Sequence, residues 1–123
     1  MVIGQLKKEV IKMSNKALWV SRHPMDVEAE EQVKHLFGVE GIDSVDFVFS
    51  EDSEKALDEL KQLADNYTIF GGVFPSQLWF ALLKNVNANL FKGKTMFLII
   101  SKSVSAEGNV RKFEFDHIEW YEF

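Results

Sequence analysis

The chain has 123 residues, 46% of them hydrophobic and 27% charged, which are ordinary values for one globular domain with a sizeable core. Its net charge of −5 argues against broad, sequence-independent binding of DNA or RNA, whereas a small anionic ligand needs only a local basic cluster. The absence of cysteine excludes a disulfide framework and fits a reducing cytoplasm. No apolar run reaches the ~20 residues of a membrane span, and no signal peptide is recognisable. We therefore expect a single cytoplasmic domain over residues 1–123, without contact to a membrane.

Residues 1–15 predict an amphipathic helix, because apolar residues recur at three- and four-residue spacing among lysines. This segment is either a docking or dimer-forming arm or, if Met13 is the natural start, a dispensable extension. The sequence leaves both alternatives open.

The first predicted strand, Ala17–Val20, ends on a cluster of anion-binding side chains. Ser21, Arg22 and His23 follow it directly, and Pro24 prevents the strand from continuing in a ladder. Arg22 offers a fork of donors suited to phosphate, and His23 can donate or accept a proton. Because ligands bind beyond the carboxyl ends of strands in open α/β sheets, this cluster is the first candidate site. The alternative is that Arg22 and His23 pair with nearby acids at the sheet edge.

The next segments predict a helix, a strand and a second helix. Residues 25–37 are acidic at their start, with Asp26 as the N-cap and Gly38 as the C-cap. Residues 44–49 alternate and then become fully apolar, as an inner strand would. Residues 56–64 carry one apolar helical stripe.

Paired glycines, Gly71 and Gly72, follow the third predicted strand, Tyr67–Phe70. They either let the backbone approach a ligand closely or simply ease packing. Ser76 is positioned to cap the next helix, whose free N–H groups favour an anion. The spacing matches neither a Walker A motif nor a dinucleotide-binding fingerprint. Residues 78–86 are apolar nearly all round, which predicts a helix that is buried or lies at a subunit contact.

Two long strands are predicted at the C-terminal end. Residues 95–100 are the most hydrophobic strand, predicted to be central, and they end on the hydroxyls and the base of residues 101–103. Residues 110–123 form the last strand, and the short turn between the two strands requires antiparallel pairing. The apolar residues of this last strand change phase between Phe115 and Ile118, which predicts either a bulge or an end that leaves the sheet.

The element order βαβαβαββ predicts an α/β domain with a mostly parallel sheet, helices on both faces and an antiparallel C-terminal strand. In this arrangement three strand ends bring polar clusters to one rim of the sheet. Each cluster is a weak signal, and their convergence indicates a ligand site. Its candidate residues are Ser21, Arg22, His23, Gly71, Gly72, Pro75, Ser76, Gln77, Ser101, Lys102 and Ser103.

Several of these motifs resemble the small stand-alone proteins encoded beside type III CRISPR systems. The motifs are Ser-Arg-His-Pro after the first strand, the Gly-x-x-Pro-like turn at Gly72–Pro75, and a strand ending in Ser101. Residues 107–119 resemble a second group of these proteins, related to the CARF (CRISPR-associated Rossmann fold) superfamily. The resemblance covers most of residues 17–123 and leaves residues 1–12 outside. It implies a Rossmann-like three-layer sandwich that binds a cyclic oligoadenylate second messenger of antiviral defence, and for some members it implies cleavage of the ring.

For this chain the resemblance implies a cyclic oligoadenylate, in particular cyclic tetra-adenylate, bound at the rim. The candidate ligand residues taken from the resemblance are Ser21, Arg22, His23, Pro75, Ser76, Gln77 and Ser101. The expected partner is therefore this small ligand, with no DNA, and a two-fold symmetric ring also suits a homodimer.

Cleavage of such a ring needs no metal or other cofactor, because RNA carries its own nucleophile, the 2′-hydroxyl. Arg22 would stabilise charge on the phosphate, and His23 would act as general acid or base. Ser21, Ser76 and Ser101 would orient the phosphate. The expected activity is that of a metal-independent ring nuclease, which yields 2′,3′-cyclic phosphate ends.

Two alternatives to catalysis stay open, namely a protein that sequesters the messenger and an interaction protein whose rim docks another protein. A further alternative follows from Arg22-His23, which resembles the Arg-His-Gly start of histidine phosphatases. Pro24 replaces the glycine of that motif, and the second histidine would have to be His117, in an acidic stretch. We therefore expect His117 to be a paired structural histidine.

Overall fold

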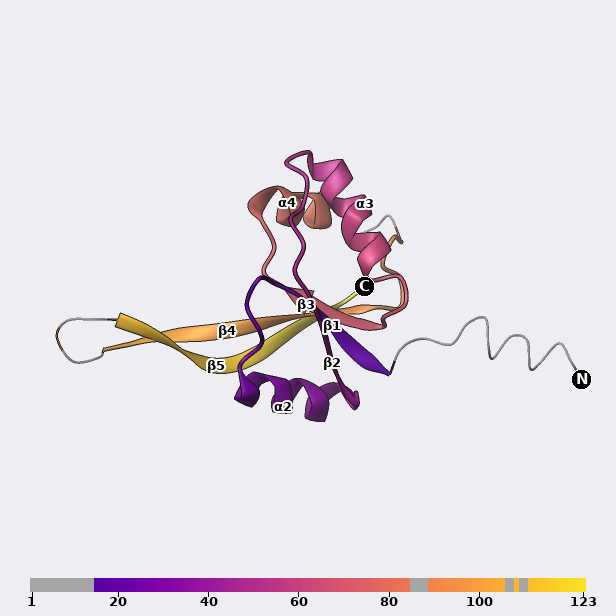
Figure 1. Cartoon of the computed structure of the whole chain (residues 1–123). Helices are drawn as coiled ribbons and strands as arrows, with labels where there is room; N and C mark the ends of the chain where they lie inside the picture. Colours follow the sequence, from indigo (N-terminus) through magenta and orange to yellow (C-terminus); the bar gives the residue numbers. More distant parts are fainter. Residues whose placement is uncertain (1–14, 85–88, 106–107, 109–110) are drawn as a thin grey trace, which may run out of the picture.

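The computed structural model describes residues 15–84, 89–105, 108 and 111–123, so the helix predicted for the N-terminal segment lies outside the described residues. The chain forms a three-layer α/β sandwich around one five-stranded sheet (Figure 1). The strands are β1 (Lys16–Val20), β2 (Gly41–Val45), β3 (Ile69–Gly72), β4 (Thr95–Ser105) and β5 (Arg111–Glu122). The helices are α2 (Val27–Phe37), α3 (Ser53–Leu63) and α4 (Ser76–Lys84).

The strand order β2-β1-β3-β4-β5 confirms the predicted Rossmann-like α/β fold. The first four strands are parallel, and β5 pairs antiparallel with β4. Helix α2 covers one face of the sheet, and α3 and α4 cover the other (Figure 1). From β1 the chain crosses to β2 on one side of the sheet order, and from β3 it crosses to β4 on the other side. The topological switch point, where such sheets bind ligands, therefore lies between β1 and β3.

Strand β1 carries the core on both of its faces. Leu18 and Val20 belong to the cluster under α3 and α4, whereas Ala17 and Trp19 belong to the cluster under α2. Successive side chains of a strand point to opposite faces, so a strand covered on both sides must be apolar throughout. This explains the unbroken apolar run that precedes Ser21.

The helices begin and end near the predicted positions. Gly38 ends α2 with a φ of 66°, a left-handed conformation that glycine adopts without strain, and its N–H donates to the carbonyl of Lys34. Asp52 caps α3, because its Oδ1 accepts from the N–H groups of Glu54 at 2.9 Å and Lys55 at 3.2 Å. Within the described ranges, none of the helices combines the length and the apolar character needed to cross a membrane.

The strand predicted over residues 44–49 differs from β2, which spans Gly41–Val45 and forms an edge of the sheet. The apolar run beyond it is not a strand. Phe49 is buried there, its ring packed edge-on against Phe74. The run is therefore apolar because it packs under α3 and α4, not because it pairs within the sheet.

The third and fourth strands also differ from prediction. Strand β3 contains both glycines and starts at Ile69, whereas Tyr67 lies before it and donates a 2.7 Å hydrogen bond to Asp43. Strand β3, not β4, is the central strand. Strand β4 continues to Ser105 because β5 stays paired with it along its whole length.

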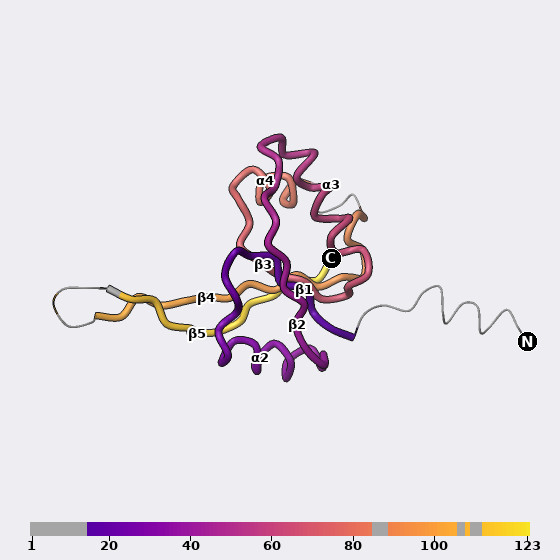
Figure 2. Tube along the Cα trace, in the orientation of Figure 1, coloured from indigo at the N-terminus to yellow at the C-terminus, as the bar shows by residue number. Residues whose placement is uncertain are grey.

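Of the two alternatives for the last strand, a bulge or an end that leaves the sheet, the structure confirms the bulge. Ile100 pairs with His117 and Ser101 pairs with Phe115, which leaves Asp116 as the extra residue of β5. The extra residue restores the phase, so Phe115 and Ile118 pack on the same side, in the cluster under α2. The β4–β5 ribbon runs well past the ends of the neighbouring strands (Figure 2).

Candidate functional site

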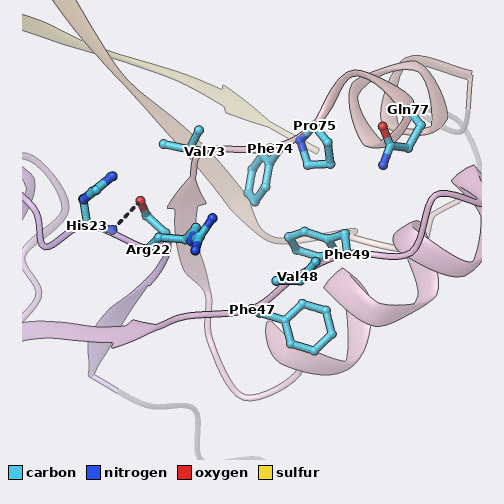
Figure 3. A pocket seen from close by; sticks show the side chains of 10 residues that line it. Arg22, His23, Phe47, Val48, Phe49, Val73, Phe74, Pro75 and Gln77 are labelled. Carbon is cyan, nitrogen blue, oxygen red and sulfur yellow. Dashed lines mark hydrogen bonds between the residues drawn. The ribbon is translucent and has the colours of Figure 1, made fainter.

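Two open hollows lie beside the switch point. The aromatic hollow, about 450 Å³, is formed by the segments that follow three strands, with Gln77 from α4. These segments are Ser21–His23 after β1, Phe47–Phe49 after β2 and Val73–Pro75 after β3 (Figure 3). The hollow therefore occupies the carboxyl rim of the sheet, where the sequence predicts a ligand site.

The α2-side hollow, about 480 Å³, lies on the opposite face of the same rim. Its lining includes Trp19 below, Asp26 at the start of α2 and Ser101 from β4. Ser21 and His23 line both hollows, so the loop after β1 separates them.

Backbone hydrogen bonds hold the loop after β1 in place. The N–H of Ser21 donates to the carbonyl of Val45 at 3.0 Å, and the N–H of Val73 donates to the carbonyl of Val20 at 3.0 Å. The N–H of His23 donates to Oγ of Ser21 at 3.2 Å (Figure 3). The backbone is thus fixed by both neighbouring strands, while the side chains of the loop face solvent.

The side chains of Arg22 and His23 are exposed at this rim. Among the described residues neither forms an ion pair or a side-chain hydrogen bond, so the alternative in which both pair with neighbouring acids finds no support. The lining of the aromatic hollow includes no carboxylate. Arg22 therefore gives this hollow a positive charge, which favours an anion.

Aromatic rings form the wall of the aromatic hollow opposite Arg22. Phe49 lies edge-on to Phe47, with ring centroids 5.0 Å apart, and edge-on to Phe74 at 6.0 Å. Val48, between the two phenylalanines, is 80% exposed. Val48 and the half-buried ring of Phe47 therefore present apolar surface to this hollow.

Polar contacts tie the segment after β2 to both helices on its side of the sheet. Nε2 of Gln77 donates to the carbonyl of Ser50 at 3.2 Å, and the N–H of Ser50 donates to Oε1 of Glu59 at 2.8 Å. Gln77 thus has a structural role. Its side-chain oxygen accepts no hydrogen bond from the described residues.

Gly71 and Gly72 are required by packing. A Cβ on Gly71 would lie 2.7 Å from the ring and the carbonyl of Phe97, and a Cβ on Gly72 would lie 2.3 Å from the carbonyl of Val20. Gly72 also lines the α2-side hollow, whereas Gly71 lines neither hollow. Close strand packing therefore accounts for both glycines, which is the second of the two interpretations given for them above.

The other predicted residues fall into two groups. Pro75 and Gln77 line the aromatic hollow, and Ser101 lines the α2-side hollow. Three residues line neither hollow, namely Ser76, Lys102 and Ser103.

These three residues lie elsewhere for physical reasons. Ser76 is the first residue of α4 rather than its cap, and the N–H of Leu78 donates to the carbonyl of Pro75 instead. Lys102 and Ser103 lie beyond the rim because β4 continues past it, and Nζ of Lys102 lies 3.9 Å from a carboxylate oxygen of Asp116.

Sequence reasoning missed the aromatic wall and the acid of the α2-side hollow. The signal for the wall was the apolar run Phe47–Phe49, which is followed directly by the polar residues 50–53. The signal for Asp26 was its position two residues after the Ser-Arg-His-Pro motif, where helix capping offered a simpler explanation.

His117 is a paired histidine, as predicted. Its Nε2 lies 2.7 Å from Oε2 of Glu119 and its Nδ1 lies 2.6 Å from Oδ2 of Asp116. These hydrogen bonds, that with Glu119 first, raise the pKa of His117 above its ordinary value. The residue lines neither hollow, so it does not supply the second histidine that a phosphatase site with Arg22 and His23 would need.

In the part of the chain that the structure describes, no group of three or more histidine, aspartate or glutamate side chains is arranged to hold a metal ion. The homodimer stays a prediction. Helix α4 leaves Phe80 65% exposed and Leu83 71% exposed, which is the kind of surface on which that prediction rests.

The fold and the hollows define a Rossmann-like α/β domain with an open hollow, lined by one arginine, at its switch point. Comparison of the chain with protein-family models, with curated proteins and with solved structures found no match.

Proposed function

We propose that this chain binds a cyclic oligoadenylate at the aromatic hollow and cleaves the ring without a metal. The observation that carries the proposal is that Arg22 and His23 both line the aromatic hollow at the switch point, with no ion pair among the described residues. A guanidinium in this position is available for a phosphate, and an imidazole that lines the same hollow is available for proton transfer.

The surroundings support a nucleotide better than a bare anion. The half-buried ring of Phe47, which lines the same hollow as Arg22, suits stacking or edge contact with a base. The overall charge of −5 would repel a long polyanion, and the cationic character is confined to a small site. A short or cyclic nucleotide satisfies both conditions.

The chemistry requires only groups that the ligand and the rim supply. The 2′-oxygen attacks the adjacent phosphorus, so that an O2′–P bond forms and the P–O5′ bond breaks. The 2′-hydroxyl gives up its proton and the leaving 5′-oxygen receives one. Arg22 stabilises the charge that develops on the phosphate, and His23 transfers a proton at one of these two oxygens. The products carry a 2′,3′-cyclic phosphate and a 5′-hydroxyl.

The test incubates the purified chain with cyclic tetra-adenylate and cyclic hexa-adenylate in the presence of EDTA. Calorimetry measures binding, and chromatography measures linear products. Arg22→Ala should weaken binding by about 10- to 150-fold, which corresponds to about 1.5–3 kcal/mol for a charge-assisted hydrogen bond. His23→Ala should slow single-turnover cleavage by about 10²–10⁴-fold and leave most of the binding.

Matched controls are available away from the rim. Lys55→Ala removes an exposed cation from α3, and His35→Ala removes an exposed histidine from α2. Both variants should bind and cleave as the wild type does. Binding without cleavage would identify a sequestering protein, whereas no binding of either ring would favour a protein-interaction role. A His23→Ala rate within about threefold of wild type would leave His23 no acid–base role.

A further inference from the structure

We propose that the α2-side hollow is a base subsite, and that Asp26 selects a base with an exocyclic amine, such as adenine. This inference rests on the proposed function, because it places the base next to a phosphate held by Arg22. It adds a specificity residue that the sequence motifs did not indicate.

The charges at the rim are divided between the two hollows. Arg22 lines only the aromatic hollow and Asp26 lines only the α2-side hollow, whereas His23 lines both. A phosphate is attracted to the first hollow and repelled from the second. The group that enters the α2-side hollow is therefore neutral or a hydrogen-bond donor, while the phosphate stays beside Arg22.

The carboxylate of Asp26 is available for such a donor. Asp26 occupies the N-cap position of α2, yet its side chain accepts no capping hydrogen bond, and only its carbonyl contacts the helix, from the N–H of Glu30 at 2.8 Å. The equivalent residue of α3, Asp52, does accept capping bonds from two backbone N–H groups. The two N-cap aspartates therefore differ in their hydrogen bonds. The side-chain oxygens of Asp26, which lines a hollow, accept no hydrogen bond from the described residues.

The rest of the hollow suits a planar base. Its volume of about 480 Å³ lies within the range of small-molecule sites, about 300–1,000 Å³. Trp19, Ile99 and Phe115 provide apolar walls, and Ser101 adds a hydroxyl. An ionised carboxylate accepts hydrogen bonds but donates none, so it pairs with an exocyclic amine and finds no partner where that amine is missing.

The test compares two ligands, cyclic tetra-adenylate and an analogue with unsubstituted purine in place of adenine, which lacks only the exocyclic amine. Calorimetry gives the ratio of the two affinities for each variant. The wild type should prefer adenine by roughly tenfold, on the scale of one specific base contact. Asp26→Ser, which removes the carboxylate and keeps a good N-cap, should bring the ratio close to one.

Two further variants separate the possible failures. Asp52→Ser makes the same change at the N-cap of α3, outside both hollows, and should leave the ratio at its wild-type value. Arg22→Ala should weaken both ligands equally and also leave the ratio unchanged. A ratio that survives Asp26→Ser, with Arg22→Ala still weakening both ligands, would overturn this inference and leave the proposed function standing. Failure of the wild type to bind either ring would overturn both.

Discussion

Nε1 of Trp19 donates a 3.1 Å hydrogen bond to the carbonyl oxygen of His23. The indole is 5% exposed and stacks on Phe97, with ring centroids 5.9 Å apart and planes 13° from parallel. One end of this contact lies in the core under α2, and the other lies in the loop that separates the two hollows. The core therefore fixes the position of the candidate site directly.

We expect Trp19→Phe to loosen that loop. Phenylalanine keeps a ring against Phe97 and loses the donor to His23, which should cost about 0.5–1.5 kcal/mol for the hydrogen bond, with a further loss from the smaller ring. Urea unfolding measures the stability, and binding of cyclic tetra-adenylate should weaken as well. Trp120→Phe, at a ring that is 49% exposed and packs against Phe37, is the control. Equal ligand affinity in the two variants would mean that the indole contact does not position the loop.

The packing of Gly72 makes a second prediction. Gly72→Ala places a Cβ 2.3 Å from the carbonyl oxygen of Val20, and a backbone atom cannot move aside as a flexible side chain can. We expect a loss of about 1–3 kcal/mol or more, as for overpacked cores. Gly41→Ala should be neutral or slightly stabilising, since a Cβ at that position meets nothing within 4 Å. Chemical denaturation of the two variants would contradict the prediction if Gly72→Ala proved as stable as Gly41→Ala.

Lys94 links the end of α3 to the start of β4, and its removal should destabilise the chain. Its Nζ donates to the carbonyls of Ala64 at 2.8 Å, Asp65 at 3.2 Å and Tyr67 at 2.6 Å. Lys94→Met keeps the apolar stem and removes the charged donor, which should cost about 1.5–3 kcal/mol. Thermal unfolding gives the loss, with the exposed neighbour Lys92→Met as control. Similar melting temperatures for the two variants would show that water replaces these contacts without cost.

His117 makes the stability of the chain depend on pH. Its hydrogen bonds to Glu119 and Asp116 raise its pKa above the ordinary value of 6.5, because they favour the imidazolium. The folded chain thus holds this proton more tightly than the unfolded chain does. The resulting stabilisation is fully present below about pH 6.5 and is lost as pH rises through the raised pKa.

The measurement is the melting temperature of wild type and His117→Ala between pH 5 and 9. The difference between the two should be largest at the acid end and should shrink toward the alkaline end, whereas His35→Ala should follow the wild-type profile. Parallel profiles for wild type and His117→Ala would show that the two carboxylates do not stabilise the charged ring.

The elements whose signals are local could be predicted from the sequence. Gly38 marks the end of α2, because a left-handed turn depends on neighbouring residues alone. The phase change before Ile118 marks the bulge, because a strand keeps its apolar side chains on one face only with an extra residue. Arg22 and His23 at a strand end were likewise identified from the sequence, since a proline beside them stops the ladder.

The elements that depend on distant partners could not be predicted. An apolar run indicates that side chains are buried, but it does not indicate which element covers them. The run Phe47–Phe49 therefore predicted a strand, although these residues pack beyond the end of β2. Strand β4 continues past the predicted end because β5 pairs with it, and this carries Lys102 and Ser103 away from the rim. The sequence by itself determined the order of helices and strands, which gives the layered α/β fold, and the cationic end of β1. The signals for these features lie within a few residues of each other. Only the tertiary structure decided which side chains share a hollow with Arg22 and which share one with Asp26, because burial and register depend on residues far apart in the chain.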